Sequence, residues 1–239
     1  MRVLAVSMSA LVLAACGGPS ASSKQPPPGP PRSDPAACKA GDGAACVRVA
    51  DAHLAQGDTP GALNIYKRGC AAGAAVGCQR FEEVAGKQCE AGDLAACNRL
   101  GFFLDQRGDP KRAAPLYQKV CDGGAMAGCV NLGYLFENGS GVAADPDRAR
   151  DLYQQACDGK DMDGCGNLAA LYFNGLGVKK DPARAAQLLA QACDGDHAQS
   201  CSVLGDLTAE GVGTGKDAAQ AKTLHQKACK LGFQDACGR

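Results

Sequence analysis

The fold of this chain is decided by residues 129–157, which read CVNLGYLFENGSGVAADPDRARDLYQQAC. The first half of this stretch has apolar residues at helical spacing, namely Leu132, Leu135 and Phe136. Asn138-Gly139 follows them, and this pair is typical of the end of a helix because glycine readily adopts the left-handed cap conformation. The sequence therefore predicts a first helix that ends at Asn138-Gly139.

A second helix is predicted from the other half of the stretch. Asp145 is a good N-cap, and Pro146 directly after it suits the first helical position. The apolar stripe that follows consists of Ala149, Leu152, Tyr153 and Ala156. Asp158-Gly159 is a second stop signal, and small residues such as Gly133 allow the two helices to lie close together. Each unit is therefore a helix, a glycine-rich loop and a second helix.

This unit recurs along the chain. The next copy repeats the loop at Gly175 and Gly177 and the helix start at Asp181-Pro182, and a weaker third copy has Gly211 and Gly213. Repeats of 32 to 36 residues are typical of helical hairpins that stack into a solenoid.

Cysteine spacing reports the same repeat. Apart from Cys16, the fourteen remaining cysteines form seven pairs that are each eight residues apart: Cys38/Cys46, Cys70/Cys78, Cys89/Cys97, Cys121/Cys129, Cys157/Cys165, Cys193/Cys201 and Cys229/Cys237. The constant spacing favours local disulfides, which would join the end of one second helix to the next first helix. Zinc is the alternative, but structural zinc sites use closer cysteine spacing and often histidine. The three histidines, His53, His197 and His225, do not follow that pattern.

Two parts of the array depart from the pattern. Only 19 residues separate Cys70 from Cys89, so we expect one helix over residues 76–90, with a kink at Gly86 as an option. The turn Arg107–Pro110 lacks the glycine-rich loop. Pro115 lies within a second-helix pattern, so that helix is expected to start late or to bend.

Composition excludes several classes of protein. Lys+Arg and Asp+Glu are both 25, which argues against a nucleic-acid binder or a polybasic membrane-surface protein. Hydrophobic residues make up 46% of the chain, enough for a packed core, whereas aromatic residues make up only 5%. The 15 cysteines indicate an oxidising compartment or a metal protein.

The first residues predict an export signal. An apolar stretch over residues 3–15 is too short to span a bilayer, and it ends in Leu13-Ala14-Ala15-Cys16. This resembles the lipobox of bacterial lipoproteins, which implies a signal peptide at 1–15, lipidation of Cys16 and, because residue 18 is Gly, the outer membrane. Residues 16–36 are rich in Pro, Ser and Gly and are expected to form a tether. The repeat domain then covers 37–239.

The repeat units resemble Sel1-like repeats, and more narrowly the cysteine-rich Hcp-type Sel1 proteins. The resemblance rests on Leu-Gly in the first helix, the Gly-x-Gly-Val loop, Asp-Pro, and Ala-Cys at the end of the second helix. It implies an all-α, TPR-like α/α solenoid of antiparallel helix pairs with one disulfide per repeat. It also implies a periplasmic or cell-surface scaffold for a protein or peptide partner. Penicillin binding or weak β-lactam hydrolysis is the alternative that it implies.

The sequence contains no recognisable catalytic motif. No serine has a lysine three positions later, and Lys222-Thr223 is followed by Leu224 rather than glycine. The histidines are far apart, and the cysteines are assigned to bridges. Gly211–Gly215 lies at an inter-helix loop, and Asp145, Asp181 and Asp217 lie at helix starts. We therefore predict no catalytic residue, no metal and no cofactor.

The predicted contacts to a partner lie on the first helices, which line the concave face in related solenoids. They are Asn131, Tyr134, Asn167 and Phe173. Hydrogen bonding between helices is the alternative for the asparagines, and core packing is the alternative for the aromatic residues. The chain is expected to be an envelope scaffold that contacts the membrane only through its anchor and binds no nucleic acid. Because no polar capping helix follows Cys237, self-association through the last repeat is a further expectation.

Overall fold

The computed structural model describes residues 34–239 and contains only helices within that range. The predicted signal segment, Cys16 and nearly all of the tether lie outside the described residues, so their roles stay predictions. The first helix begins at Pro35, slightly before the predicted start of the repeats at residue 37. None of the described helices is long and apolar enough to cross a membrane.

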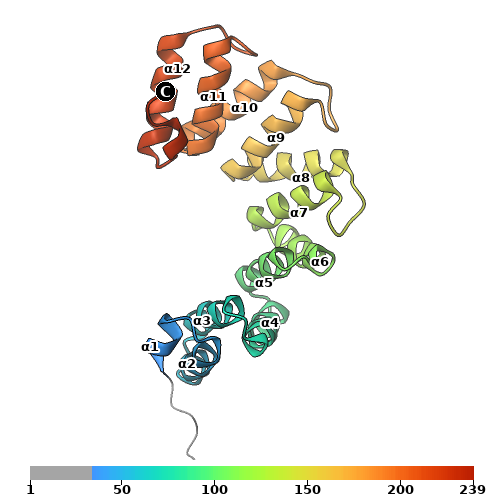
Figure 1. The fold of residues 1–239 in the computed structure, drawn as a ribbon. Coiled ribbons are helices and arrows are strands. Elements are labelled where there is room, and N and C mark those ends of the chain that lie inside the picture. Colours follow the sequence, from blue (N-terminus) through green and yellow to red (C-terminus); the bar gives the residue numbers. More distant parts are fainter. Residues whose placement is uncertain (1–33) are drawn as a thin grey trace, which may run out of the picture. The chain divides into compact units, whose positions relative to one another are not determined.

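Twelve α-helices and one short 3-10 helix follow one another in residues 34–239 (Figure 1). Their bounds are α1 Pro35–Lys39, α2 Gly43–Ala55, α3 Thr59–Ala71, α4 Ala75–Glu90, α5 Leu94–Gln106, α6 Pro110–Asp122, α7 Met126–Asn138, α8 Pro146–Asp158, α9 Met162–Asn174, α10 Pro182–Asp194, α11 Ala198–Glu210, α12 Ala218–Lys230 and η1 Gln234–Ala236.

The helices pack mainly against their neighbours in sequence. The closest pairs are α2 with α3, α5 with α6, α7 with α8, α9 with α10 and α11 with α12. Each pair also packs against the next, and α4 lies between α3 and α5 without a partner of its own. The prediction of an α/α solenoid is therefore confirmed, and its stability is a sum of local terms.

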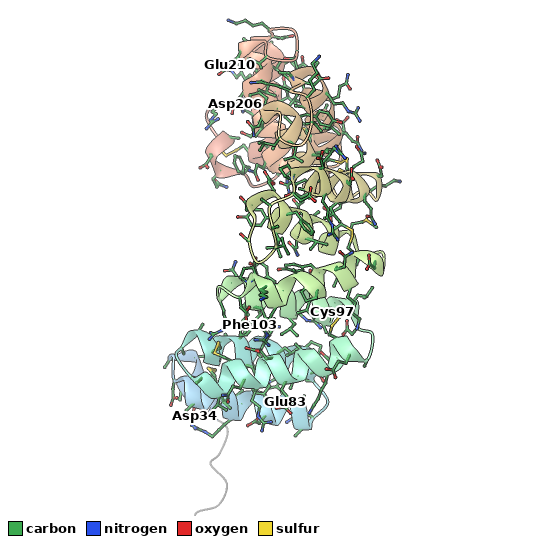
Figure 2. All side chains as sticks on the ribbon, turned by 90° about the vertical axis from the view of Figure 1, so that its right-hand side faces the viewer. Asp34, Glu83, Cys97, Phe103, Asp206 and Glu210 are labelled. Carbon is green, nitrogen blue, oxygen red and sulfur yellow. A yellow bond between two sulfur atoms is a disulfide. The ribbon has the colours of Figure 1, made fainter. Side chains whose placement is uncertain are left out.

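Seven disulfides connect successive helices, as the spacing predicted. Six of them join the end of one helix to the first turn of the next, with Cα atoms 4.5–4.6 Å apart. Cys97 of α5, labelled in Figure 2, is bonded to Cys89 of α4 in this way. The seventh joins Cys229 of α12 to Cys237 just after η1. Each bridge therefore fastens two neighbouring units of the array.

The glycine-rich loop packs on the preceding repeat. Gly139 caps α7 in the left-handed conformation, with φ 67°. Gly177 also has positive φ, and a Cβ atom placed on it would lie 2.5 Å from the carbonyl oxygen of Pro146, in the first turn of α8. Gly213 approaches Pro182 in the same way. This contact explains the recurrence of the second glycine, and Gly211–Gly215 lies in an inter-helix loop, as expected.

The irregular segment is one uninterrupted helix, α4. Phe81 of α4 stacks on Phe103 of α5, labelled in Figure 2, with ring centroids 4.3 Å apart. The option of a late start for the Pro115 helix is wrong, because α6 begins at Pro110 with Asp109 as its N-cap. Pro115 itself is exposed and lies inside α6. The helix therefore keeps its full length despite lacking one backbone donor.

Candidate ligand-binding groove

A cavity of about 440 Å³ opens on the face made by the first helices α7, α9 and α11. Its apolar lining comes from Val130, Phe173, Leu189 and Val203. Leu189 is contributed by α10, which packs against both α9 and α11. We call this cavity the groove.

All four residues that the sequence predicted as partner contacts line the groove: Asn131, Tyr134, Asn167 and Phe173. They come from two consecutive repeats, with two residues on α7 and two on α9. The structure thus brings them together, while their contact with a ligand stays a prediction.

Within residues 34–239, twelve of the cysteines are buried, Cys229 is half-buried and Cys237 is exposed, and none of them lines the groove. Five of them belong to first helices and are at most 1% exposed: Cys46 of α2, Cys97 of α5, Cys129 of α7, Cys165 of α9 and Cys201 of α11. Their predicted pairing is confirmed, because they form the bridges Cys38–Cys46, Cys89–Cys97, Cys121–Cys129, Cys157–Cys165 and Cys193–Cys201. The sequence predicted them as bridge residues and not as partner contacts, and their burial agrees with that role. The bridges of Cys129, Cys165 and Cys201 hold the helices α7, α9 and α11, which carry the groove.

The alternative of core packing is wrong for Tyr134. Core packing is the usual role of an aromatic residue at helical spacing, but Tyr134 is 52% exposed. Phe102, at the equivalent position of α5, is 45% exposed. Helical spacing shows which residues share a face, and here no described element covers that face. Aromatic residues are enriched at protein interfaces, so the exposed ring of Tyr134 beside a cavity favours a binding surface.

The two asparagines differ in their partners. Asn131 donates from Nδ2 to Oδ1 of Asn98 at 3.0 Å, so the alternative of inter-helix hydrogen bonding holds for this residue. Within residues 34–239, the side chain of Asn167 makes no hydrogen bond. Its amide lines the groove and has both donors and an acceptor available for a ligand.

Three residues at one end of the groove were not predicted from the sequence. His197 Nδ1 lies 2.6 Å from Oγ of Ser200, and His197 Nε2 lies 3.0 Å from Oδ1 of Asp163. All three line the groove. The sequence analysis looked for a lysine three positions after each serine. It therefore missed His197, which lies three positions before Ser200, and Asp163, which belongs to the preceding repeat.

The other histidines lie apart from the groove. His53 contacts Asp58, and His225 is buried beside Asp206 of α11, which is labelled in Figure 2. In the described part of the chain, no group of three or more His, Cys, Asp or Glu side chains is placed to hold a metal ion.

The stacked helix pairs and the groove on their first helices define a helical-repeat solenoid protein. The Sel1 repeat model matches residues 93–124, 127–161, 163–197 and 198–233, which together are more than half of the chain. The chain therefore belongs to the Sel1 repeat family. Each matched segment corresponds to one helix pair, from α5/α6 to α11/α12. Comparison with curated proteins found no match.

Solved structures include similar solenoids. A protective antigen of uropathogenic Escherichia coli with an SLR fold is 18% identical, with a TM-score of 0.58 over 84% of this chain and 48% of the antigen. This chain thus spans about half the length of that relative. A Sel1 repeat protein from Oxalobacter formigenes is 21% identical, with a TM-score of 0.60, over 82% of this chain and 76% of that one. Helicobacter pylori cysteine rich protein B is 34% identical, with a TM-score of 0.45, over 54% of this chain and 92% of that one.

Proposed function

We propose that this Sel1 repeat protein is a lipid-anchored scaffold of the bacterial envelope, and that its groove binds an extended peptide segment of another envelope protein. The observation that carries the proposal is the groove itself, where the exposed ring of Tyr134 lies with the unpaired amide of Asn167. A carboxamide has donors and an acceptor, so it complements both polar groups of a peptide unit. Tyr134 and Phe173 supply apolar area for side chains of the segment.

The envelope location is supported by two features. Fourteen cysteines paired in seven disulfides suit an oxidising compartment, because cytosolic reductants keep thiols reduced. The lipobox-like sequence that ends at Cys16 provides the anchor. Radiolabelled palmitate would be incorporated into the full chain and not into Cys16→Ala, and the lipidated chain would fractionate with the outer membrane.

Peptide binding is tested by panning a library of displayed linear peptides on the oxidised full chain. Selected peptides are then measured by calorimetry. We expect Tyr134→Ala and Asn167→Ala to weaken binding at least tenfold, because both remove groups that line the groove. The control is Leu176→Ala, which removes an exposed apolar side chain from the α9–α10 loop outside the groove. Equal affinity of all three variants would contradict the assignment to the groove.

β-Lactam hydrolysis is the second function, and it rests on the resemblance to Hcp-type proteins alone. Turnover of a chromogenic cephalosporin by the oxidised full chain is its test. Absence of turnover would remove this alternative and leave the peptide proposal unaffected.

A further inference from the structure

The residues at the polar end of the groove differ from those at the equivalent positions of the other repeats. Helix α11 begins with His197 as N-cap, where α5 and α9 have aspartate and α7 has alanine. Ser200 occupies the position that is Ala96 in α5, Gly128 in α7 and Gly164 in α9. Asp163 of α9 stands where α5 and α7 have alanine. Three departures from the repeat therefore meet in one place.

We propose that Ser200, His197 and Asp163 form a nucleophilic site that takes the acyl group from small carboxylic esters. This activity goes beyond peptide binding and takes place in the same groove. In this site Ser200 is the nucleophile, His197 is the base and the carboxylate of Asp163 positions the histidine.

Hydrogen bonding defines the role of each residue. The carboxylate of Asp163 only accepts, so in a neutral ring Nε2 of His197 carries the proton and donates it at 3.0 Å. Nδ1 is then the acceptor, and the hydroxyl of Ser200 donates to it at 2.6 Å. The ring nitrogens are used in the reverse order of the usual serine triad, but the direction of proton flow is the same.

The surroundings leave room for a substrate. Gly166 of α9 faces this site, and a Cβ atom placed on it would lie 3.2 Å from Oγ of Ser200 and 3.5 Å from Cε1 of His197. The absence of a side chain at Gly166 therefore leaves space next to Oγ of Ser200, a residue that is otherwise buried. Val130, Phe173 and Val203 line the same cavity and suit an apolar acyl chain.

The start of α11 supplies further donors. The side chain of His197 makes no capping hydrogen bond, unlike Asp161 at the start of α9. Amides of the first helical turn have no acceptor within the helix, so they are available on the same turn as Ser200 for the negative oxygen of a tetrahedral intermediate.

The proposed reaction is ester hydrolysis in two steps. Oγ of Ser200 forms a bond with the ester carbonyl carbon, and its proton moves to Nδ1 of His197. The ester C–O bond then breaks, and the alcohol leaves with that proton. Water attacks the acyl-serine, His197 takes one proton from the water and returns it to Oγ, and the carboxylic acid is released. One ester and one water thus give one acid and one alcohol.

Labelling with a fluorophosphonate tests the nucleophile. The oxidised full chain is treated with the probe, and intact mass and peptide mapping locate the adduct. We expect one adduct per chain, at Ser200, and none in Ser200→Ala, a change to the residue that α5 has at this position. The matched control is Ser202→Ala, because Ser202 lies two positions away on α11, is equally buried and does not line the groove. Circular dichroism verifies that the variants are folded.

Turnover of p-nitrophenyl butyrate tests the other two residues. We expect His197→Gln to lower the rate by about 100-fold or more, as for loss of a general base. Asp163→Asn should lower kcat with little change in KM, and Asp163→Glu should restore part of the rate, which a merely structural role would not do. An adduct that persists in Ser200→Ala, or no adduct at Ser200 in folded protein, would overturn the proposal. Neither result would contradict peptide binding, which is tested separately through the peptide affinities of Tyr134→Ala and Asn167→Ala.

Discussion

Gly133 of α7 lies directly beneath the ring of Tyr153 of α8. A Cβ atom placed on Gly133 would be 2.7 Å from Cε1 of that ring, which is closer than real side chains approach. Tyr153 cannot easily move, because it is fully buried and its hydroxyl donates to Oε2 of Glu137 at 2.8 Å. Burial and the nearby Glu137 carboxylate raise the pKa of Tyr153, so the phenol stays a donor throughout the physiological range. The close packing of α7 against α8 therefore depends on the absence of a side chain at Gly133.

Replacing Gly133 with alanine is expected to lower the free energy of unfolding. Alanine improves helix propensity by about 1 kcal/mol, but overpacking costs about 1–3 kcal/mol. The control is Gly86→Ala in α4, where the nearest heavy atom would be 4.0 Å from the new Cβ atom. This variant should gain up to about 1 kcal/mol because it only improves propensity. Urea denaturation measures both, and stabilisation of both variants would contradict the packing argument.

The neighbouring repeat has a different pair of residues at these two positions. Ala169 and Leu189 occupy the positions of Gly133 and Tyr153, thirty-six residues later, and both are buried. The double variant Gly133→Ala/Tyr153→Leu should therefore lose less stability than the sum of its single variants. We expect a coupling of about 1 kcal/mol, within the range found for residues in contact. A double-mutant cycle in urea measures it, and strict additivity would show that the two positions act separately.

Lys160 adopts a conformation that most repeats reserve for glycine. It follows α8 with φ 65°, whereas Gly124 has φ 83° at the equivalent position after α6. The left-handed conformation costs a non-glycine residue about 1–2 kcal/mol. A glycine at the same position avoids this cost, but its greater freedom in the unfolded chain offsets part of the gain in stability.

Lys160→Gly should therefore raise the free energy of unfolding by about 0.5–1 kcal/mol. The same substitution at Lys222, which is exposed in the interior of α12, should lower it by about 1 kcal/mol. Thermal denaturation by circular dichroism compares the two. A loss of stability in both variants would mean that the backbone at Lys160 carries no strain.

The sequence was sufficient to predict the helices but not the whole site. Leu132, Leu135 and Phe136 have helical spacing on one face in the sequence, and the structure buries all three. The exposure of the Tyr134 side chain could not be predicted in this way, because the repeat pattern does not reveal which face of the helix lacks a packing partner. Asp163 and Ser200 lie in different repeats, so their approach through His197 depends on how α9 and α11 pack. The signal that could have found this site is the presence of His197 at an N-cap where other repeats have Asp93 or Asp161.

The last disulfide differs from the others in its exposure. Cys237 is exposed and Cys229 is half-buried, whereas every cysteine in the other six pairs is at most 9% exposed. Thiol exchange requires access of the attacking thiolate to a sulfur atom. The nearest competitor is the Cys70–Cys78 pair, because Nη1 of Arg107 lies 3.1 Å and 3.3 Å from its two sulfur atoms and would stabilise a departing thiolate. Its burial nevertheless restricts attack.

Limited reduction is therefore expected to open Cys229–Cys237 first. Each local bridge of this length contributes about 2.5 kcal/mol by chain entropy, and the loss at the end of the array affects only α12 and η1 because stability in a solenoid is local. Brief treatment with dithiothreitol, alkylation and peptide mapping would find the label on these two cysteines while the helical signal is nearly unchanged. Complete reduction should lower the melting temperature of the whole array. Early labelling of Cys70 and Cys78 instead would show that the charge of Arg107 outweighs burial, and an unchanged melting curve after complete reduction would show that the bridges do not support the fold.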